Sequence, residues 1–139
     1  MAEFDYIVVG AGSSGCVVAA RLSEDPANNV LVLEAGGEDN HPYLKMPLAF
    51  LKAMPDPRFN WNYWTEAEPH LDGRRMPLPR GKVMGGSGSI NGMFAMRGHP
   101  ADYDQWAQMG ARGWSYADVL PYFKKSESSW RGESDFHGS

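Results

Sequence analysis

The stretch Asp5–Ala35, DYIVVGAGSSGCVVAARLSEDPANNVLVLEA, decides the fold of this chain. Within it, Tyr6–Val9 is a short apolar run rich in β-branched side chains, which is typical of a parallel strand buried on both faces. A glycine turn follows, then a helix over about 13–23, and then a second apolar strand over Val30–Leu33. The order strand, turn, helix, strand predicts a βαβ unit and therefore an α/β fold.

The turn between the first strand and the helix has the spacing G-x-G-x-x-G, with glycines at positions 10, 12 and 15. In this motif Gly10 makes the tight turn, Gly12 lets a pyrophosphate approach the backbone, and Gly15 lets the helix pack close to the strand. The helix would direct its unpaired N–H groups at the phosphates. Glu34 ends the second strand, where an acid can hydrogen-bond a ribose 2′-hydroxyl. Together these features predict a dinucleotide site.

A glycine-rich βα turn in any parallel α/β protein would explain the glycines, but it would not explain the position of Glu34. A carboxylate there would repel a 2′-phosphate, which makes NADP a poorer ligand than NAD or FAD. The motif alone does not distinguish NAD from FAD.

The length of 139 residues is short for the fold that the motif predicts. A doubly wound dinucleotide-binding domain needs about five or six parallel strands. The sequence offers two convincing ones, and it stops in a turn-like run, Ser134–Ser139. We therefore expect the chain to be an incomplete part of a larger protein.

The charge and composition predict an ordinary protein without a nucleic-acid partner, because the formal net charge is −4. Basic residues at Arg74, Arg75, Arg80 and Lys82 lie near aromatic ones, but they form a weak footprint against an acidic whole and suit a solvated or anion-facing loop better. The sequence shows no signal peptide and no apolar run near the ~20 residues of a membrane span. We expect a cytoplasmic protein, with attachment to a membrane surface as an alternative.

Two segments between residues 41 and 68 are expected to pack through apolar faces. After Pro47 the spacing predicts a short helix whose buried face carries Leu48, Phe50, Leu51 and Met54. Residues 56–68 alternate aromatic and polar side chains, which predicts an extended segment whose buried face carries Phe59, Trp61 and Tyr63. Further along, the pattern predicts a helix over 101–109 and another that opens at Ser115-x-x-Asp118.

A second glycine-rich stretch, RGKVMGGSGSINGMF, covers residues 80–94 and holds five glycines. Beside Ser87, Ser89 and Asn91, this many glycines predict a backbone that approaches a flat or charged ligand and offers it hydrogen bonds. A flexible linker would not need the apolar residues interleaved here. A serine-hydrolase elbow, G-x-S-x-G, is excluded because Ser89 stands where the second glycine would be.

The same stretch also carries a family resemblance. The pattern Arg80-Gly-Lys-x-x-Gly-Gly-Ser-Gly-Ser-x-Asn91-Gly, which continues to Trp106, is similar to the signature of the glucose–methanol–choline (GMC) family of flavin oxidoreductases. The first βαβ unit, and later motifs such as Phe136-His137-Gly138, are also similar, so the resemblance covers essentially the whole chain. Within the family it is nearest to the bacterial choline dehydrogenase and aliphatic alcohol dehydrogenase branch.

The resemblance implies FAD and places its parts along the chain. It puts the pyrophosphate at Gly10, Gly12, Ser13, Ser14 and Gly15, the adenosine ribose at Glu34 and Ala35, and the flavin side at Val83, Ser87, Asn91, Gly92, Met93 and Phe94. Some members attach FAD covalently through a histidine immediately before the asparagine. Ile90 occupies that position here and has no nucleophilic nitrogen, so non-covalent FAD is expected.

By the same resemblance, residues 1–139 are the N-terminal segment of a discontinuous, Rossmann-like FAD-binding domain. The remaining flavin and substrate segments lie outside the chain, as does the family's alcohol-activating histidine with its partner near the C-terminus. No catalytic base is therefore assigned here. The histidines lack ligand spacing and are expected to be surface or structural residues rather than bases or metal ligands; they are His41, His70, His99 and His137.

The function that the resemblance implies is oxidation of an alcohol to an aldehyde or ketone. Hydride would pass to flavin N5, oxygen or a quinone would take the electrons, and this chain would hold and orient the FAD. One alternative is another reaction on the same flavin, such as photodecarboxylation of fatty acids. The other is a non-catalytic module that keeps the FAD-binding fold.

Overall fold

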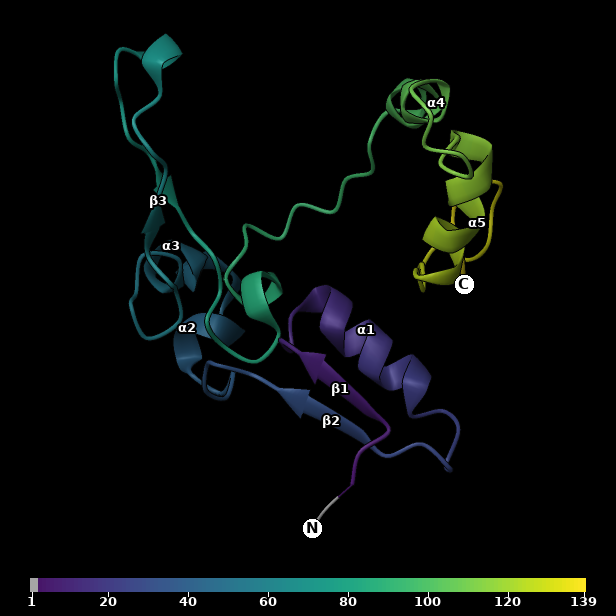
Figure 1. Cartoon of the computed structure of the whole chain (residues 1–139), viewed down its shortest axis with the longest axis horizontal. Helices are drawn as coiled ribbons and strands as arrows, with labels where there is room; N and C mark the ends of the chain where they lie inside the picture. Colours follow the sequence, from purple (N-terminus) through teal and green to yellow (C-terminus); the bar gives the residue numbers. More distant parts are fainter. Residues whose placement is uncertain (1–2) are drawn as a thin grey trace. The chain divides into compact units, whose positions relative to one another are not determined.

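The computed structural model describes residues 3–139, which fall into two compact units (Figure 1). The N-terminal unit extends to Phe94, and the C-terminal unit covers Ala95–Ser139. The predicted α/β character is confirmed in the N-terminal unit, which contains the strands, whereas the C-terminal unit is built on helices.

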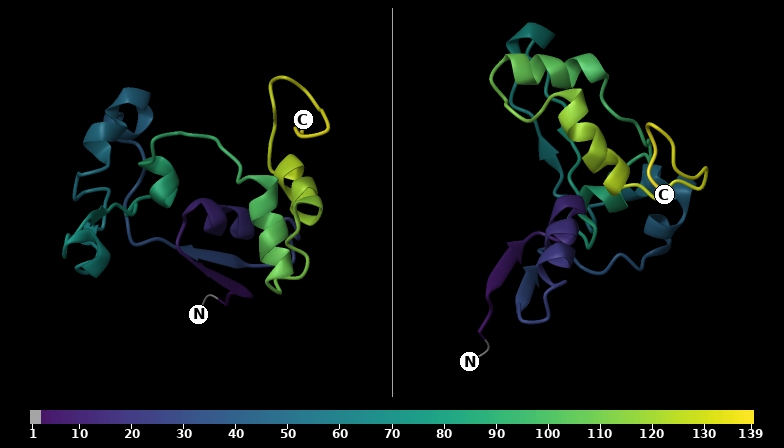
Figure 2. Two further views of the ribbon diagram at one scale, coloured as in Figure 1. Left: turned by 90° about the horizontal axis from the view of Figure 1, so that it is seen from above. Right: turned by 90° about the vertical axis from the view of Figure 1, so that its right-hand side faces the viewer.

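The predicted βαβ unit is confirmed. Strand β1 (Tyr6–Val9), helix α1 (Ser13–Leu22) and strand β2 (Val30–Leu33) follow one another, and the two strands pair in parallel from Tyr6 opposite Val30 to Val9 opposite Leu33. Helix α1 packs on both strands (Figure 2). Because parallel strands need a crossover, the helix fixes the glycine turn at the carboxyl end of β1.

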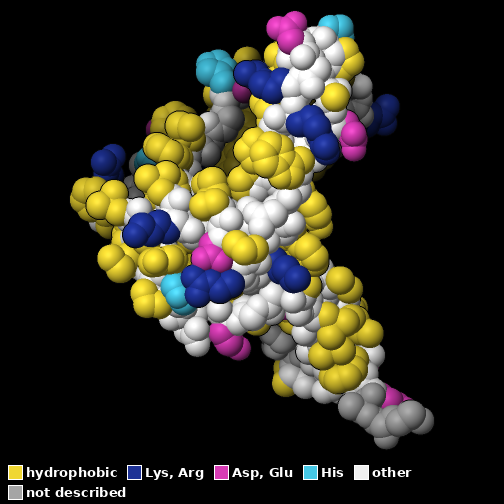
Figure 3. All heavy atoms as spheres, turned by 90° about the vertical axis from the view of Figure 1, so that its left-hand side faces the viewer, with side chains coloured by type: hydrophobic (Ala, Val, Ile, Leu, Met, Phe, Trp, Pro, Cys, Tyr) yellow, Lys and Arg dark blue, Asp and Glu magenta, His cyan; other side chains and the backbone are white. Residues whose placement is uncertain are grey.

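The prediction that the first strand is buried on both faces is wrong for the described residues. Ile7 is 58% exposed and Val9 is 83% exposed. The reason is that this sheet has two strands with α1 packed on it, which covers one face and leaves the other uncovered. Hydrophobic side chains lie across much of the surface visible in Figure 3.

Three short helices follow the β1–β2 sheet: α2 (Pro42–Lys45), η1 (Pro47–Ala49) and α3 (Phe50–Ala53). The predicted helix after Pro47 is present, but its predicted buried face is wrong for Leu48 and Leu51, which are 86% and 67% exposed. Phe50 and Met54 are half-buried, and Ala53 is the fully buried residue. Leu48 and Leu51 stand three positions apart and share the exposed face.

The core of the N-terminal unit is small. It consists of the buried side chains of Ala53, Phe59, Val83 and Ile90, with Tyr43 and Leu44 packed against them. Ala53 belongs to α3, Phe59 precedes β3, and Val83 and Ile90 lie in the second glycine-rich stretch, so the core joins α3 to that stretch.

The segment that precedes this stretch contains β3 (Tyr63–Trp64) and β4 (Pro77–Leu78), which pair antiparallel, with η2 (Pro69–Leu71) between them. The predicted buried aromatic face is correct for Phe59 and wrong for Trp61 and Tyr63, which are 41% and 49% exposed. Their rings stack on each other instead, 5.9 Å between centroids with 6° between planes. A two-residue ladder offers no sheet surface that could bury them.

Two helices form the C-terminal unit, α4 (Pro100–Gln108) and α5 (Tyr116–Lys125), close to their predicted positions. Both begin with a capping box, in which His99 pairs with Asp102 and Ser115 pairs with Asp118. Aromatic rings join the helices: the Tyr103 ring lies 5.7 Å from that of Phe123, between centroids.

The residues after α5 form turns and bends without regular secondary structure, but side-chain contacts hold them in place. The Glu127 carboxylate accepts a hydrogen bond from Arg97 Nη2 at 2.6 Å, and it lies 3.0 Å from His137 Nδ1. Gly138 is buried, and its carbonyl oxygen accepts a hydrogen bond from Ser129 N.

Candidate functional site

The N-terminus of α1 has the features expected of an anion site. Gly12 is the N-cap, and no side chain caps the helix. The first helical hydrogen bond runs from Cys16 N to Gly12 O, so the N–H groups of Ser13, Ser14 and Gly15 precede it. A ligand at this position would meet unpaired donors and the positive end of the helix dipole.

Gly15 has the packing role that the motif predicts. A Cβ atom at this position would collide with the carbonyl oxygen of Gly10 and would also touch the side chain of Val8. The absence of a side chain therefore lets α1 approach the end of β1.

The second glycine-rich stretch contacts the first directly. Gly85 N donates to Ala11 O at 2.8 Å, and Gly12 and Gly85 form a parallel bridge. The short helix η3 (Gly86–Ser89) follows, and a Cβ atom on Gly86 would lie 2.8 Å from Gly12 Cα. Two stretches about seventy residues apart in the sequence are thus held backbone to backbone. The space between them admits no further side chain.

Glu34 joins this arrangement through its carboxylate. Oε2 accepts a hydrogen bond from Ala11 N, and Oε1 accepts one from Gly36 N, each at 2.8 Å. Each carboxylate oxygen can accept a second hydrogen bond. Glu34 therefore fixes the glycine turn to the loop after β2 and can still accept a hydrogen bond from a ligand hydroxyl.

A pocket of about 370 Å³ opens where these pieces meet. Of the residues predicted to bind FAD, it brings together Gly10, Gly12, Glu34, Ala35 and Ser87. Its lining also includes Trp61 and Arg80, which the sequence analysis did not assign to the site. The sequence analysis places Arg80 in a solvated or anion-facing loop, and its positive charge is the sequence signal that could have assigned it to the site. Trp61 was assigned to the core, and nothing in its pattern indicated the pocket.

The predicted flavin-side residues are placed differently. Asn91 and Met93 line a separate, smaller pocket of about 100 Å³, together with residues of α2, η1 and α3. Asn91 Oδ1 accepts a hydrogen bond from Met93 N at 2.8 Å, and Met93 has a left-handed backbone with φ of 59°. Gly92 lies between them, and a Cβ atom there would lie 3.2 Å from the Phe94 ring.

Two of the predicted flavin-side residues differ widely in exposure. Val83 is 1% exposed and belongs to the core, so it offers almost no surface to a ligand. Phe94, in contrast, is 86% exposed. The remaining pair, Ser13 and Ser14, are exposed on the first turn of α1.

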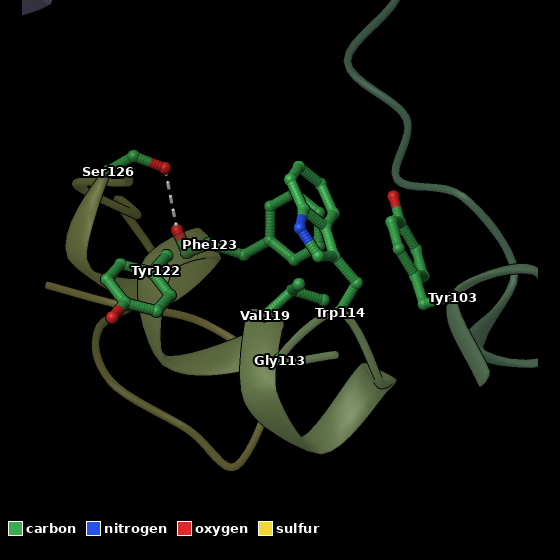
Figure 4. A pocket seen from close by; sticks show the side chains of 7 residues that line it. All are labelled: Tyr103, Gly113, Trp114, Val119, Tyr122, Phe123 and Ser126. Atoms are coloured by element: carbon green, nitrogen blue, oxygen red, sulfur yellow. Dashed lines mark hydrogen bonds between the residues drawn. The ribbon is translucent and has the colours of Figure 1, made fainter. Parts of the chain in front are cut away.

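The C-terminal unit has a pocket of its own, of about 540 Å³, which Figure 4 shows. Its lining is mostly aromatic and apolar, and consists of Tyr103, Gly113, Trp114, Val119, Tyr122, Phe123 and Ser126. The Ser126 hydroxyl donates to Phe123 O at 3.0 Å, within α5 and its end. None of the predicted site residues lies here, and the mostly apolar lining offers few of the polar groups that a dinucleotide needs.

The titratable groups with shifted pKa values lie outside the candidate site. Hydrogen bonds from Arg58 lower the pKa of Asp56 from 3.8 to about 2. The hydrogen bond with His137 lowers the pKa of Glu127 below 4.5, with Arg97 as a further cause. Residues 3–139 contain no group of three or more potential metal ligands.

The histidines of the described chain have local structural contacts. His41 Nδ1 accepts a hydrogen bond from Tyr43 N at the start of α2, and His99 Nδ1 accepts one from Ala101 N at the start of α4. Both side chains thus cap the start of a helix.

Comparison with known proteins gives consistent results. The sequence profile described as GMC oxidoreductase matches residues 4–136. The chain is 56% identical to an oxygen-dependent choline dehydrogenase of Sinorhizobium fredii over 137 residues, which cover 99% of this chain and 25% of that protein. It is 51% identical to an oxygen-dependent choline dehydrogenase of Vibrio vulnificus over 98% of this chain and 24% of that protein.

Solved structures resemble the fold as well. The crystal structure of pyridoxine 4-oxidase from Mesorbium loti superposes with a TM-score of 0.89 at 39% identity, over 98% of this chain and 27% of that one. A formate oxidase of Aspergillus oryzae gives a TM-score of 0.82 at 32% identity, over 98% of this chain and 25% of that one. The chain spans about a quarter of the length of the curated relatives it matches.

Proposed function

The chain belongs to the GMC oxidoreductase family, and on that premise we propose that it binds FAD as the N-terminal segment of a discontinuous FAD-binding domain. The observation that carries the proposal is the contact between the two glycine-rich stretches, at Gly12 and Gly86, beside the carboxylate of Glu34. FAD is the cofactor of this family. The polar groups that the pocket offers suit the pyrophosphate and the adenosine ribose of such a molecule.

The residues present fit this cofactor. A Cβ atom on Gly86 would occupy space at the backbone of Gly12, and α1 begins without a side-chain cap. Both features keep side chains away from the place where a pyrophosphate would need backbone donors. Within the site, Ser13, Ser14 and Gly15 would donate through their backbones, and Glu34 and Ala35 would hold the ribose. The flavin side would lie along Val83, Ser87, Asn91, Gly92, Met93 and Phe94.

We assign a non-covalent cofactor, because Ile90 stands immediately before Asn91 and is 2% exposed. A hydrocarbon side chain cannot form a bond to the flavin, and this one belongs to the core.

The activity we assign to the whole protein is oxidation of an alcohol. Bound FAD supplies the hydride acceptor for that reaction. The part of this chain is to bind and orient the cofactor, and the base that takes the hydroxyl proton is assigned to residues beyond position 139. Oxygen is the preferred electron acceptor over a quinone, because the matched relatives are described as oxygen-dependent. A small primary alcohol of the choline or pyridoxine kind is the substrate class that the relatives favour.

None of the helices in residues 3–139 is long and apolar enough to cross a membrane. We propose a cytoplasmic location, with attachment to a membrane surface as the alternative.

The experiment uses the longest natural polypeptide that contains this chain, purified and kept under anaerobic conditions. We expect the absorbance of bound flavin, release of free FAD on denaturation, and bleaching on addition of choline or another primary alcohol. A protein that carries no flavin would contradict the cofactor assignment. A protein that holds FAD but is not bleached by any alcohol would contradict the activity alone.

A further inference from the structure

The second glycine-rich stretch uses both of its serine hydroxyls to bind its own backbone. Ser87 Oγ accepts a hydrogen bond from Gly81 N at 3.0 Å, and Ser89 Oγ donates one to Met84 O at 2.8 Å. A hydroxyl group has one hydrogen to donate. Ser87 therefore keeps its hydrogen for a ligand, whereas Ser89 has already used its own.

The hydrogen bond from Ser89 closes a tight turn over residues 84–89. Gly85 has a left-handed backbone with φ of 87°, and Gly86 N donates to Val83 O at 2.7 Å. A Cβ atom on Gly85 would lie 2.2 Å from Ser89 Oγ. The hydroxyl thus occupies the space that a side chain on Gly85 would need, and the turn is built around it.

The carbonyl that Ser89 binds belongs to a peptide group that joins the two glycine-rich stretches. This group consists of the C=O of Met84 and the N–H of Gly85, and that N–H donates to Ala11 O at 2.8 Å. Because a peptide group is planar, a hydrogen bond to its carbonyl also fixes the direction of its N–H. The group is therefore held on one side by Ser89 and on the other by the turn after β1.

Without Ser89 this peptide group would have an alternative orientation. Glycine adopts positive and negative φ with similar ease, so rotation of the peptide group before Gly85 meets little steric resistance. The rotation would turn the N–H away from Ala11 and break the contact beside Gly12. The bond from Ser89 opposes this change, because the carbonyl would lose its hydrogen-bond partner as well.

We propose that Ser89 is a positioning residue, which locks the peptide group between Met84 and Gly85 in the orientation that joins the two stretches at FAD. Ser89 acts through this peptide group and donates no hydrogen bond to the cofactor, although it lines the smaller pocket with Asn91 and Met93. This inference rests on the proposed function, since it requires that FAD occupies the site.

The first test compares Ser89→Ala with Ser23→Ala in the longest natural polypeptide that contains the chain, after removal of FAD and titration with fresh FAD. Ser23 is the matched control, because its hydroxyl also donates to a backbone carbonyl, Ala20 O at 3.1 Å, and it lies outside the candidate pocket. We expect Ser89→Ala to raise the Kd for FAD about fivefold, through loss of one hydrogen bond. Ser89→Thr keeps the hydroxyl and should stay within about twofold of the unaltered protein, as should Ser23→Ala.

Hydrogen exchange in the FAD-free protein distinguishes positioning from a general loss of stability. Ser89→Ala should accelerate exchange at the Gly85 amide, because this N–H is no longer held toward its acceptor. The amides of β2, which pairs with β1, should exchange as in the unaltered protein. Equal acceleration in both places would overturn the positioning role.

A double variant distinguishes positioning from direct contact with FAD. The new Cβ atom in Gly85→Ala collides with the Ser89 hydroxyl, whereas it lies 3.5 Å from the Ser89 Cβ atom, an ordinary contact distance. Positioning therefore predicts that Ser89→Ala causes no further loss of FAD affinity in the Gly85→Ala background. Effects that multiply would mean that Ser89 binds the cofactor itself, and the inference would be overturned.

The inference is also overturned if Ser89→Ala binds FAD as tightly as the unaltered protein, or if Ser23→Ala weakens binding equally. Failure of the unaltered protein to bind FAD at all would instead contradict the proposed function.

Discussion

In the N-terminal unit the two glycine-rich stretches meet backbone to backbone, at Gly12 with Gly86, beside the uncapped start of α1. In the C-terminal unit side chains cap both helices, and the carboxylate of Glu127 is paired with Arg97 and His137. Backbone contacts between glycines leave N–H groups free to meet a ligand, whereas the polar groups of the C-terminal unit bind one another. This difference supports the proposal that the N-terminal unit binds the cofactor.

The largest effect that this comparison predicts is that of Gly15→Val. The new side chain would collide with the carbonyl oxygen of Gly10, so it should destabilise the unit by about 3 kcal/mol. It should also raise the Kd for FAD by roughly a hundredfold. Thermal unfolding and FAD titration measure both quantities. Gly37→Ala is the control, because a Cβ atom at Gly37 has no neighbour within 4 Å, and normal FAD affinity is expected there.

A smaller effect is expected for Gly86→Ala, and Gly113→Ala in the C-terminal unit is its counterpart. Both positions have positive φ, 58° and 79°, so the left-handed backbone alone should cost each alanine about 1 kcal/mol of stability. Only the Gly86 side chain would press on the backbone of Gly12, so only that variant should weaken FAD binding, by about tenfold. Equal FAD affinities for the two variants would break the comparison.

The helix cap of α5 should contribute to stability but not to FAD binding. The Ser115 hydroxyl accepts a hydrogen bond from Asp118 N, and Ser115→Ala should cost about 1 kcal/mol of stability. The affinity for FAD should stay unchanged, because the cap lies in the C-terminal unit. Denaturant unfolding beside FAD titration provides the check, with exposed Ser128→Ala as the control. A loss of FAD affinity in Ser115→Ala would assign the C-terminal unit a part in the site.

The smallest effect is expected from Glu127→Gln, and it should depend on pH. The folded protein lowers the pKa of Glu127 below 4.5, so the ionised carboxylate adds stability above that pH. This stability is lost as the pH falls below 4.5 through the folded pKa. The difference in unfolding free energy between the unaltered protein and Glu127→Gln should therefore shrink as the pH falls. A difference that is constant from pH 6 to pH 3 would contradict the assignment, and Glu133→Gln is the exposed control.

The N-terminal βαβ unit could be predicted from the sequence because its signals are local. The β-branched run before Gly10, the glycine spacing and the terminal position of Glu34 each restrict a short piece of backbone. The capping box at Ser115 and Asp118 is local in the same sense, and it too was found correctly. The family resemblance added the ligand, which the glycine spacing alone left open between NAD and FAD.

The burial of single side chains and the lining of the pocket could not be predicted, because they depend on contacts between residues that are distant in the sequence. Leu48 and Leu51 were expected to be buried but are exposed, because periodicity shows which residues share a face and not which face meets the core. Trp61 was assigned to a buried face, yet it lines the pocket because its backbone is bound to Arg80, nineteen residues away. The pairing of Glu127 with Arg97 and His137 had no sequence pattern at all.

The most direct test of the account is a crystal structure of the complete protein with FAD bound. The account predicts that one FAD molecule contacts both glycine-rich stretches. Its pyrophosphate should touch the backbone of residues 10–15 and of the second stretch from Gly85 onward, with the ribose at Glu34. FAD bound elsewhere, or in contact with only one of the two glycine-rich stretches, would contradict it.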